Sequence, residues 1–213
     1  MHYRLAIFDY DGTLVDSFQW FMGVFGEVAE RYRFKRPDRD QLEAMRGLSA
    51  RELVRKLDVA VWKLPLIANH MRKLVARDRD AMRLFAGVPE MLHVLAERDV
   101  AIAIVTSNAE HNVRHGLGGE LSRLVRYYEC GASMFGKPRK LRNVLRRSGC
   151  HPGQALAIGD EIRDIEAARA AGLRFGAVGW GYTTLAALRA YGPEEIFEAV
   201  ADIPRCFDAG RPA

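Results

Sequence analysis

The sequence predicts an α/β fold in which a parallel sheet is interrupted by an all-α insertion. Four short apolar runs precede helical patterns, as expected of parallel strands joined by crossover helices. These runs are Leu5–Phe8, Ala101–Val105, Ala155–Ile158 and Arg174–Val178. The interval between the first two runs is much longer than one crossover needs, and apolar residues recur in it at helical spacing. Together these observations predict a Rossmann-like core with a helical insertion after its first strand.

The composition fits one medium domain with an insertion, or two small domains. The 213 residues are 49% hydrophobic and 28% charged, which is enough apolar content for a core. No apolar run reaches the length of a membrane span, and the N-terminus lacks the pattern of a secretory leader. The three cysteines have no metal-binding spacing, which indicates reduced thiols in a cytoplasmic protein.

The first apolar run leads directly into two aspartates, in the stretch LAIFDYDGTLVDS (residues 5–17). Asp9 follows the strand at its carboxyl end, where open α/β sheets bind their ligands. Asp11 lies on the same side if the chain stays extended. Carboxylates this close need a cation, a proton or hydrogen bonds to compensate them. A simple turn is the alternative, and it accounts for Asp11 and Gly12 but not for Asp9.

Residues 17–84 are predicted to be helical throughout, with Pro65 tolerated in a first helical turn. They hold 15 Lys and Arg against 9 Asp and Glu, a balance of +6, whereas the rest of the chain balances to −1, so the basic excess lies in this segment. A solvated helical face is the commonest cause of such an excess, followed by an anionic small-molecule partner. Nucleic acid ranks last because no nucleic-acid-binding motif accompanies the charge. The stretch FAGVPE, residues 85–90, returns the chain to the core, which gives a core of residues 1–16 and 85–213 and a helical domain of residues 17–84.

Polar residues also follow the second predicted strand. In VTSN, Thr106, Ser107 and Asn108 lead into a helix, where free N–H groups and a hydroxyl favour an anion. Ordinary helix capping explains the same residues. In FGKPRK, residues 135–140, Lys137 stands at a helix start that would prefer an anion, so it needs a partner unless it is a plain surface lysine. It is one of only 6 lysines against 26 arginines, which indicates that a compact ammonium is required there.

The third predicted strand ends in GDEIRDIEAARAAG, residues 159–172. Asp160 ends the strand and Asp164 lies four residues on, facing the same way once the helix begins, while Glu161 and Arg163 point elsewhere. The small residues that follow allow this helix to lie close to the sheet. A helix cap followed by a surface carboxylate is the simpler alternative for this motif.

Taken in order, these motifs resemble those of the haloacid dehalogenase-like hydrolase superfamily. The similarity covers nearly the whole chain. FGKPRK, GDEIRDIEAARAAG and the later stretch VGWGY (residues 178–182) are most similar to its phosphoglycolate-phosphatase-like branch. That branch carries a small helical cap where residues 17–84 lie.

The resemblance implies a phosphatase that hydrolyses a small phosphate monoester through an aspartyl-phosphate, with Mg²⁺ as cofactor. Asp9 would be the nucleophile and Asp11 the acid and base, oriented by Thr13. Asp9 and Asp160 would bind Mg²⁺ through carboxylates and Asp11 through its backbone carbonyl. Asp164 and Glu161 would hold Lys137 or a metal-bound water. The residues expected at the phosphate are Gly12, Thr13, Thr106, Ser107, Asn108 and Lys137.

Charge and ligand type agree with this expectation. Asp9, Asp11, Asp160 and Asp164 bring four negative charges to one crevice, and Lys137 returns only one positive charge. A divalent cation restores most of the balance. Oxygen ligands without a His or Cys cluster favour Mg²⁺ over zinc.

Other functions remain open at this point. A signalling receiver module also uses strand-end aspartates but lacks the helical insertion and GDxxxD, and a degenerate scaffold would not keep every motif residue. A sugar-phosphate mutase is the main alternative, although Ala50 stands in RGLSARE (residues 46–52) where the mutase pattern has an arginine. A phosphonate hydrolase would need a Schiff-base lysine, for which the candidates are Lys35, Lys56, Lys63 and Lys73.

The expected partner is a small phosphorylated metabolite, not nucleic acid or a membrane, and the chain is expected to be a monomer or homodimer. Arg46 and Arg51 are candidates for a second anionic group of the substrate. Ordinary surface arginine is the more common role for each of them.

Overall fold

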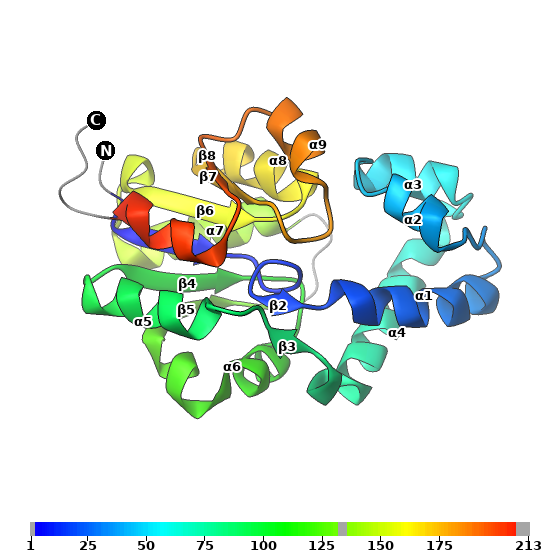
Figure 1. Cartoon of the computed structure of the whole chain (residues 1–213), viewed down its shortest axis with the longest axis horizontal. Coiled ribbons are helices and arrows are strands. Elements are labelled where there is room, and N and C mark those ends of the chain that lie inside the picture. Colours follow the sequence, from blue (N-terminus) through cyan, green and yellow to red (C-terminus); the bar gives the residue numbers. More distant parts are fainter. Residues whose placement is uncertain (1–2, 132–135, 208–213) are drawn as a thin grey trace.

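The computed structural model of the chain describes residues 3–131 and 136–207. It contains a six-stranded parallel sheet, which lies beside a group of helices (Figure 1). The strands run in the order β5-β4-β1-β6-β7-β8, so β1 lies in the centre between β4 and β6. The strand bounds are Leu5–Phe8 (β1), Ala101–Val105 (β4), Val125–Glu129 (β5), Ala155–Gly159 (β6), Arg174–Val178 (β7) and Glu195–Phe197 (β8).

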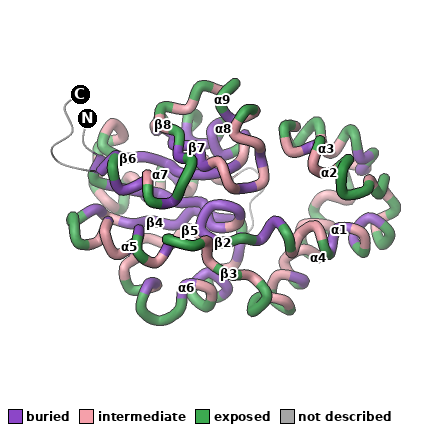
Figure 2. Tube along the Cα trace, viewed as in Figure 1, coloured by how far each residue is buried: buried purple, intermediate pink, exposed green. Residues whose placement is uncertain are grey.

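Helices cover both faces of this sheet, because alternate residues of each central strand face opposite layers. One face packs against Val88–Glu97 (α5), Glu110–Leu124 (α6) and the 3₁₀ segment Val200–Phe207 (η4). The other face packs against Lys137–Ser148 (α7), Ile162–Ala170 (α8) and Leu185–Ala190 (α9). Ala6 and Phe8 of β1 belong to the first core, whereas Leu5 and Ile7 belong to the second. Figure 2 shows that burial is concentrated in these central strands. The predicted α/β fold with a Rossmann-like parallel sheet is confirmed.

Four of the six strands were predicted, and β6 continues one residue further, to Gly159. The two unpredicted strands, β5 and β8, lie at the two edges of the sheet. β5 carries charged and aromatic residues and β8 has only three residues, so neither has the apolar run of a central strand.

Residues 18–81 form a separate group of helices beside the sheet (Figure 1). The helices are Phe18–Tyr32 (α1), Arg39–Ala44 (α2), Ala50–Lys56 (α3) and Leu64–Arg77 (α4), with Pro65 in the first turn of α4. They have apolar clusters of their own, one built around Phe25, Ala29 and Met45 and one around Val24, Val28 and Leu74. Among the described residues, none of the helices is both long enough and apolar enough to cross a membrane.

The expectation of helix throughout residues 17–84 is wrong at the end of the segment. Arg83–Leu84 form a short strand, β3, that pairs antiparallel with Val15–Asp16, β2. Asp16 faces Arg83 in this ribbon, so the chain leaves and re-enters the sheet region through two adjacent strands. The backbone N–H of Phe85 also donates to the carbonyl of Leu14 at 3.0 Å. The division into two domains stays a prediction, and this ribbon lies at its two boundaries.

Candidate active site

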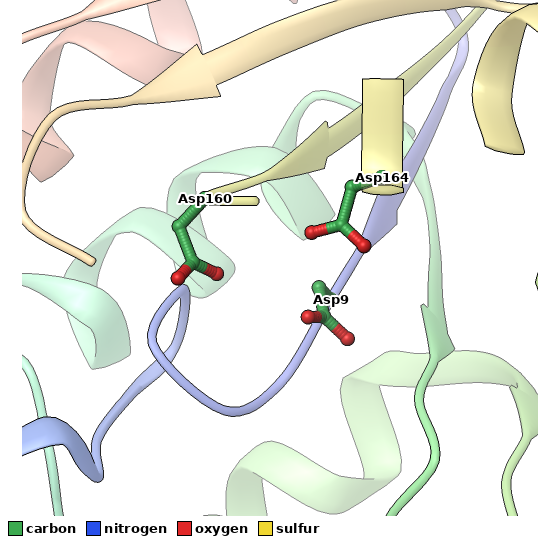
Figure 3. A group of neighbouring side chains, drawn as sticks. All are labelled: Asp9, Asp160 and Asp164. Carbon is green, nitrogen blue, oxygen red and sulfur yellow. The ribbon is translucent and has the colours of Figure 1, made fainter. Parts of the chain in front are cut away.

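Three buried aspartates converge at the carboxyl edge of the sheet (Figure 3). Asp9 follows β1, Asp160 follows β6, and Asp164 lies in the first turn of α8. One carboxylate oxygen of each lies within 4.8 Å of the others. Their exposed fractions are only 6%, 0% and 3%, so the carboxylates are close together and largely removed from water.

Asp160 is held by two hydrogen bonds, one to each oxygen. The hydroxyl of Thr13 donates to Oδ1 at 2.7 Å, and the backbone N–H of Tyr182 donates to Oδ2 at 2.7 Å. Two glycines allow this close packing, since a Cβ at Gly12 or Gly181 would lie 2.3 or 2.2 Å from the Asp160 side chain. Gly12 also has φ +80°, which favours glycine on its own account. Thr13, expected to orient Asp11, directs its hydroxyl to Asp160 instead.

Lys137 lies at the start of α7 and bridges two of the aspartates. Its Nζ lies 2.9 Å from Oδ1 of Asp9 and 2.6 Å from Oδ1 of Asp164. Oδ2 of Asp164 accepts from the backbone N–H of Glu161 at 3.2 Å. A cation at a helix N-terminus is unfavourable by itself, and these carboxylates are the partners that stabilise it. Lys137 is therefore not an ordinary surface lysine. Phe135 of the same motif lies outside the described residues.

The electrostatics leave an uncompensated negative charge at the aspartates. Burial raises the pKa of Asp9, although Lys137 opposes this, and burial raises the pKa of Asp160 well above its usual range. Burial alone would lower the pKa of Lys137, but Asp164 and Asp9 outweigh it, so that its pKa lies above the usual range. Three carboxylates and one ammonium sum to −2, which one divalent cation would neutralise.

The three carboxylates fit a divalent metal ion in both charge and ligand chemistry. The donors are all oxygens, the type that hard cations such as Mg²⁺ prefer, and no histidine or cysteine joins the described cluster. Each carboxylate oxygen has two lone pairs, so the hydrogen bonds at Asp160 do not prevent coordination. Asp9, Asp160 and Asp164 could therefore hold a metal ion.

Asp11 lies beside this cluster and is engaged by Asn108. The side-chain amide of Asn108 donates to both carboxyl oxygens of Asp11, at 3.2 and 3.4 Å. Burial, and then the charge of Asp9, raise the pKa of Asp11 to about 7. A carboxyl group with this pKa can give or take a proton near neutral pH.

Thr106 and Ser107 connect β4 to α6. Thr106 is buried, and its hydroxyl accepts from the backbone N–H of Asn108 at 3.0 Å, whereas Ser107 is exposed. Lys140 donates to the Thr106 carbonyl at 2.7 Å and fixes the loop from the α7 side. The predicted contacts of these residues with a phosphate stay predictions.

Glu161 and Arg163 form a contact of their own at the start of α8. Glu161 is the N-cap residue, and its carboxylate accepts from the guanidinium of Arg163. Burial raises the pKa of Glu161 despite the opposing charge of Arg163. Glu161 thus contacts the site through its backbone N–H at Asp164, while its side chain is paired with Arg163.

The two candidate arginines of the helical segment have different surroundings. Arg46 donates to the backbone carbonyls of Gly181 at 2.6 Å and Tyr182 at 3.0 Å, pairs with Glu43 at 2.9 Å, and stacks over Phe18. Arg51 lies exposed on α3. Arg46 therefore connects the helices to the loop that holds Asp160, which sequence reasoning did not anticipate.

Tyr182 is the second residue of this connection, and sequence reasoning did not single it out. Its hydroxyl lies 3.0 Å from Oγ of Ser17, and its ring packs edge-on against Phe18 and Phe21 of α1. Its backbone N–H holds Asp160, as described above. The stretch VGWGY contained the residue, but no local pattern reveals a partner that is 165 positions away.

Comparisons with known proteins agree with this architecture. Residues 6–178 match the family model described as haloacid dehalogenase-like hydrolase. The phosphoglycolate phosphatase of Synechococcus elongatus is 30% identical over 201 residues, which cover 94% of this chain and 95% of that protein. The pyrophosphatase PpaX of Oceanobacillus iheyensis is 25% identical over 210 residues, covering 95% and 96%.

Solved structures with lower identity share the fold. A Lactobacillus plantarum protein superposes with a TM-score of 0.82 at 24% identity, covering 97% of this chain and all of that one. CbbY of Rhodobacter sphaeroides, solved in complex with phosphate, superposes with a TM-score of 0.70 at 20% identity, covering 94% and 96%.

Proposed function

Since the chain belongs to the haloacid dehalogenase-like hydrolase family and is a phosphatase, we propose that it hydrolyses a small phosphate monoester through an aspartyl-phosphate on Asp9, with Mg²⁺ as cofactor. The observation that carries the proposal is the placing of Asp9. It lies at the carboxyl end of the central strand, paired with Lys137 at 2.9 Å, with Asp11 two residues further on.

In the first step, a carboxylate oxygen of Asp9 attacks the phosphorus atom in line with the ester bond. A P–O bond to Asp9 forms, and the P–O bond to the leaving alcohol breaks. The leaving oxygen takes the proton of Asp11, whose pKa of about 7 leaves it substantially protonated near neutral pH. The products of this step are the free alcohol and the phosphorylated Asp9.

In the second step, Asp11 acts as the base. Its carboxylate takes a proton from a water molecule, the resulting hydroxide attacks phosphorus, and the bond between phosphorus and Asp9 breaks. Inorganic phosphate leaves, and Asp9 and Asp11 return to their starting states. Asp11 can serve both steps because it loses a proton in the first step and gains one in the second.

The remaining motif residues would stabilise charge on the phosphoryl group. Lys137 supplies a fixed ammonium, and the hydroxyl of Thr106 would supply a hydrogen-bond donor. Asp9, Asp160 and the backbone carbonyl of Asp11 would hold Mg²⁺, with Asp164 keeping Lys137 in place. When bound, the ion would offset the phosphate charge and draw electron density from phosphorus.

The substrate is proposed to be small and to resemble phosphoglycolate. Support comes from the activity named for the Synechococcus elongatus relative and from the basic excess of residues 17–84. We propose that these residues form a cap over a core of residues 1–16 and 85–213. We also propose that the protein is cytoplasmic, which agrees with three cysteines that form no disulfide.

The phosphonate-hydrolase alternative has little support in the described residues. A Schiff-base lysine must lose its proton, which burial favours. Lys35, Lys56 and Lys73 are exposed, and Lys63 donates to the carbonyl of Tyr32 at 2.7 Å.

A panel of phosphate esters assayed with Mg²⁺ tests the proposal. The panel contains 2-phosphoglycolate, p-nitrophenyl phosphate, hexose phosphates and inorganic pyrophosphate, with release of inorganic phosphate as the readout. Release from a small monoester, with 2-phosphoglycolate among the best substrates, supports it. Interconversion of hexose phosphates without net release of inorganic phosphate would establish the mutase activity instead. A preference for pyrophosphate would replace the phosphate monoester as the proposed substrate.

A further inference from the structure

The side chain of Asn108 has a single allowed orientation. Its Oδ1 accepts from the backbone N–H of Ala109 at 2.8 Å and from Nδ2 of Asn112 at 3.1 Å. A backbone N–H can only donate, so the oxygen of the amide must face it. The NH₂ group of Asn108 is therefore directed at Asp11.

The backbone around Asn108 is equally constrained. Its N–H donates to the hydroxyl of Thr106 at 3.0 Å, and its carbonyl accepts from the N–H of Gly131 at 2.7 Å. Lys140 donates to the carbonyls of both Thr106 and Gly131. The loop after β4 is thus anchored on two sides, and Asn108 has little freedom to follow a moving carboxylate.

Asn112 lies one helical turn further along α6 and is as buried as Asn108, each with an exposed fraction of 6%. Its Oδ1 has no hydrogen-bond partner among the described residues. A buried, half-satisfied amide costs free energy. A buried asparagine at position 112 is explained if its NH₂ group serves to hold Asn108.

From these contacts we infer that Asn108, braced by Asn112, is a positioning residue that holds the carboxyl group of Asp11 in place for proton transfer to the leaving group. The inference rests on the proposed function, in which Asp11 is the acid of the first step. The nitrogen of this NH₂ group lies 3.4 Å from one oxygen of the carboxyl group and 3.2 Å from the other, so an N–H is shared between both oxygens, and this restricts rotation about the Cβ–Cγ bond of Asp11.

Such a role has a kinetic signature that depends on the leaving group. Phenolate is a poor leaving group and requires a proton, whereas p-nitrophenolate leaves without one. The ratio kcat/KM reports events up to the first irreversible step, which is phosphorylation of Asp9 when the alcohol departs. A misplaced Asp11 should thus lower kcat/KM for phenyl phosphate but leave kcat/KM for p-nitrophenyl phosphate nearly unchanged, although the two esters have nearly the same shape.

The experiment measures kcat/KM for both esters with Asn108→Ala, Asn112→Ala and the control Asn143→Ala, which removes a half-buried asparagine of α7. General-acid catalysis is worth roughly 10²–10⁴ in rate. We expect Asn108→Ala to lower kcat/KM for phenyl phosphate by about 10- to 100-fold more than for p-nitrophenyl phosphate. Asn112→Ala should act in the same direction by a smaller factor, and Asn143→Ala should leave the ratio unchanged.

Equal losses on both esters, or no loss on either, would overturn the inference. Circular dichroism checks folding, and if Asn108→Ala does not fold, Asn112→Ala carries the test. In an Asp11→Asn background, Asn108→Ala should have no further effect on phenyl phosphate, and a further selective loss would also overturn the inference. The proposed function is tested separately: if Asp9→Asn retained turnover, the proposed function would be contradicted, whatever the result for Asn108.

Discussion

The hydroxyl of Thr13 donates a 2.7 Å hydrogen bond to Oδ1 of Asp160, although 147 positions separate the two residues. Thr13 belongs to the loop after β1, and Asp160 directly follows β6, so this bond connects the carboxyl ends of two neighbouring strands. With the N–H of Tyr182 on Oδ2, both oxygens of Asp160 are oriented by the protein itself. Sites arranged in advance lose little free energy to reorganisation during the reaction.

Replacement of the proposed nucleophile should abolish turnover. Asn has nearly the shape of Asp but cannot form an acyl-phosphate, so Asp9→Asn is expected to lower phosphate release by at least about 10⁴-fold. The far-ultraviolet circular dichroism spectrum should stay unchanged. Asp99→Asn, which alters an exposed aspartate, is the control and should keep full activity. Measurable turnover by Asp9→Asn at a tenth of the normal rate would remove Asp9 as nucleophile.

The central strands and the acidic motifs are readable from the sequence because each is a local pattern. A strand buried on both faces is a continuous apolar run, and its functional residues follow at its end. The edge strands β5 and β8 lack such runs and escape detection.

Contacts between motifs are also invisible in the sequence. Asn108 was expected at the phosphate, yet its amide donates to Asp11, and Arg46 donates to carbonyls 135 and 136 positions away. The choice among many polar partners depends on how the helices and loops pack, which no spacing rule specifies.

A methyl group at Gly181 should weaken metal binding. The added Cβ would lie 2.2 Å from the side chain of Asp160, which must then move. Overpacking of this kind costs roughly 1–3 kcal/mol, so Gly181→Ala is expected to weaken Mg²⁺ affinity by about tenfold or more in calorimetric titration. Gly119→Ala is the matched control, because a Cβ there meets no atom within 4 Å. Equal Mg²⁺ affinities for the two variants would show that Asp160 does not contribute to the metal site.

The stability of the metal-free protein should respond to pH through the raised pKa values. Burial raises the pKa of Asp9, Asp11 and Asp160 above the ordinary value of 3.8, that of Asp11 to about 7. The folded state then binds more protons than the unfolded state between about pH 4 and pH 7. The contribution of these groups to the free energy of unfolding is therefore fully present at low pH, and it is lost as the pH rises through that window.

A divalent cation should reverse this loss. A ligand whose free concentration is 100 times its dissociation constant adds about 2.7 kcal/mol to the free energy of unfolding. For a chain of this size, this corresponds to an increase of roughly 5–10 °C in Tm. We expect Mg²⁺ to raise Tm by about that much at pH 8 and by clearly less at pH 5, as measured by differential scanning calorimetry. In Asp160→Asn the increase at pH 8 should disappear. A shift as large at pH 5, or one retained in Asp160→Asn, would contradict the assignment of the metal to these carboxylates.

Arg46 should matter for every substrate, because it connects the helices to the loop that holds Asp160. Its hydrogen bonds to the carbonyls of Gly181 and Tyr182 are charge-assisted and partly buried. Allowing for its partial exposure, we expect Arg46→Ala to lower kcat/KM by about tenfold on 2-phosphoglycolate and p-nitrophenyl phosphate alike. Arg55→Ala removes an exposed arginine of α3 and should have no effect. A loss confined to 2-phosphoglycolate would instead mean that Arg46 contacts the carboxylate of the substrate.

Arg51 tests whether the basic excess of residues 17–84 serves substrate capture. It is exposed on α3, so its guanidinium is available to an anionic group that the substrate carries beyond its phosphate. A charge-assisted contact that becomes desolvated is worth roughly 1.5–3 kcal/mol, or about ten- to a hundredfold in kcat/KM. A solvated arginine contributes almost nothing. We therefore expect Arg51→Ala to lower kcat/KM for 2-phosphoglycolate much more than for p-nitrophenyl phosphate.

The salt dependence of this difference shows how Arg51 acts. Long-range attraction is screened over about 10 Å at 0.1 M ionic strength, so steering should fade as salt is added. A contact closed off from water should persist, since salt screens buried pairs much less. Steady-state kinetics of the wild type and Arg51→Ala at low and high salt separate these two cases. Equal losses on both esters at every salt concentration, or none on either, would mean that the charge of Arg51 is only part of a solvated helical face.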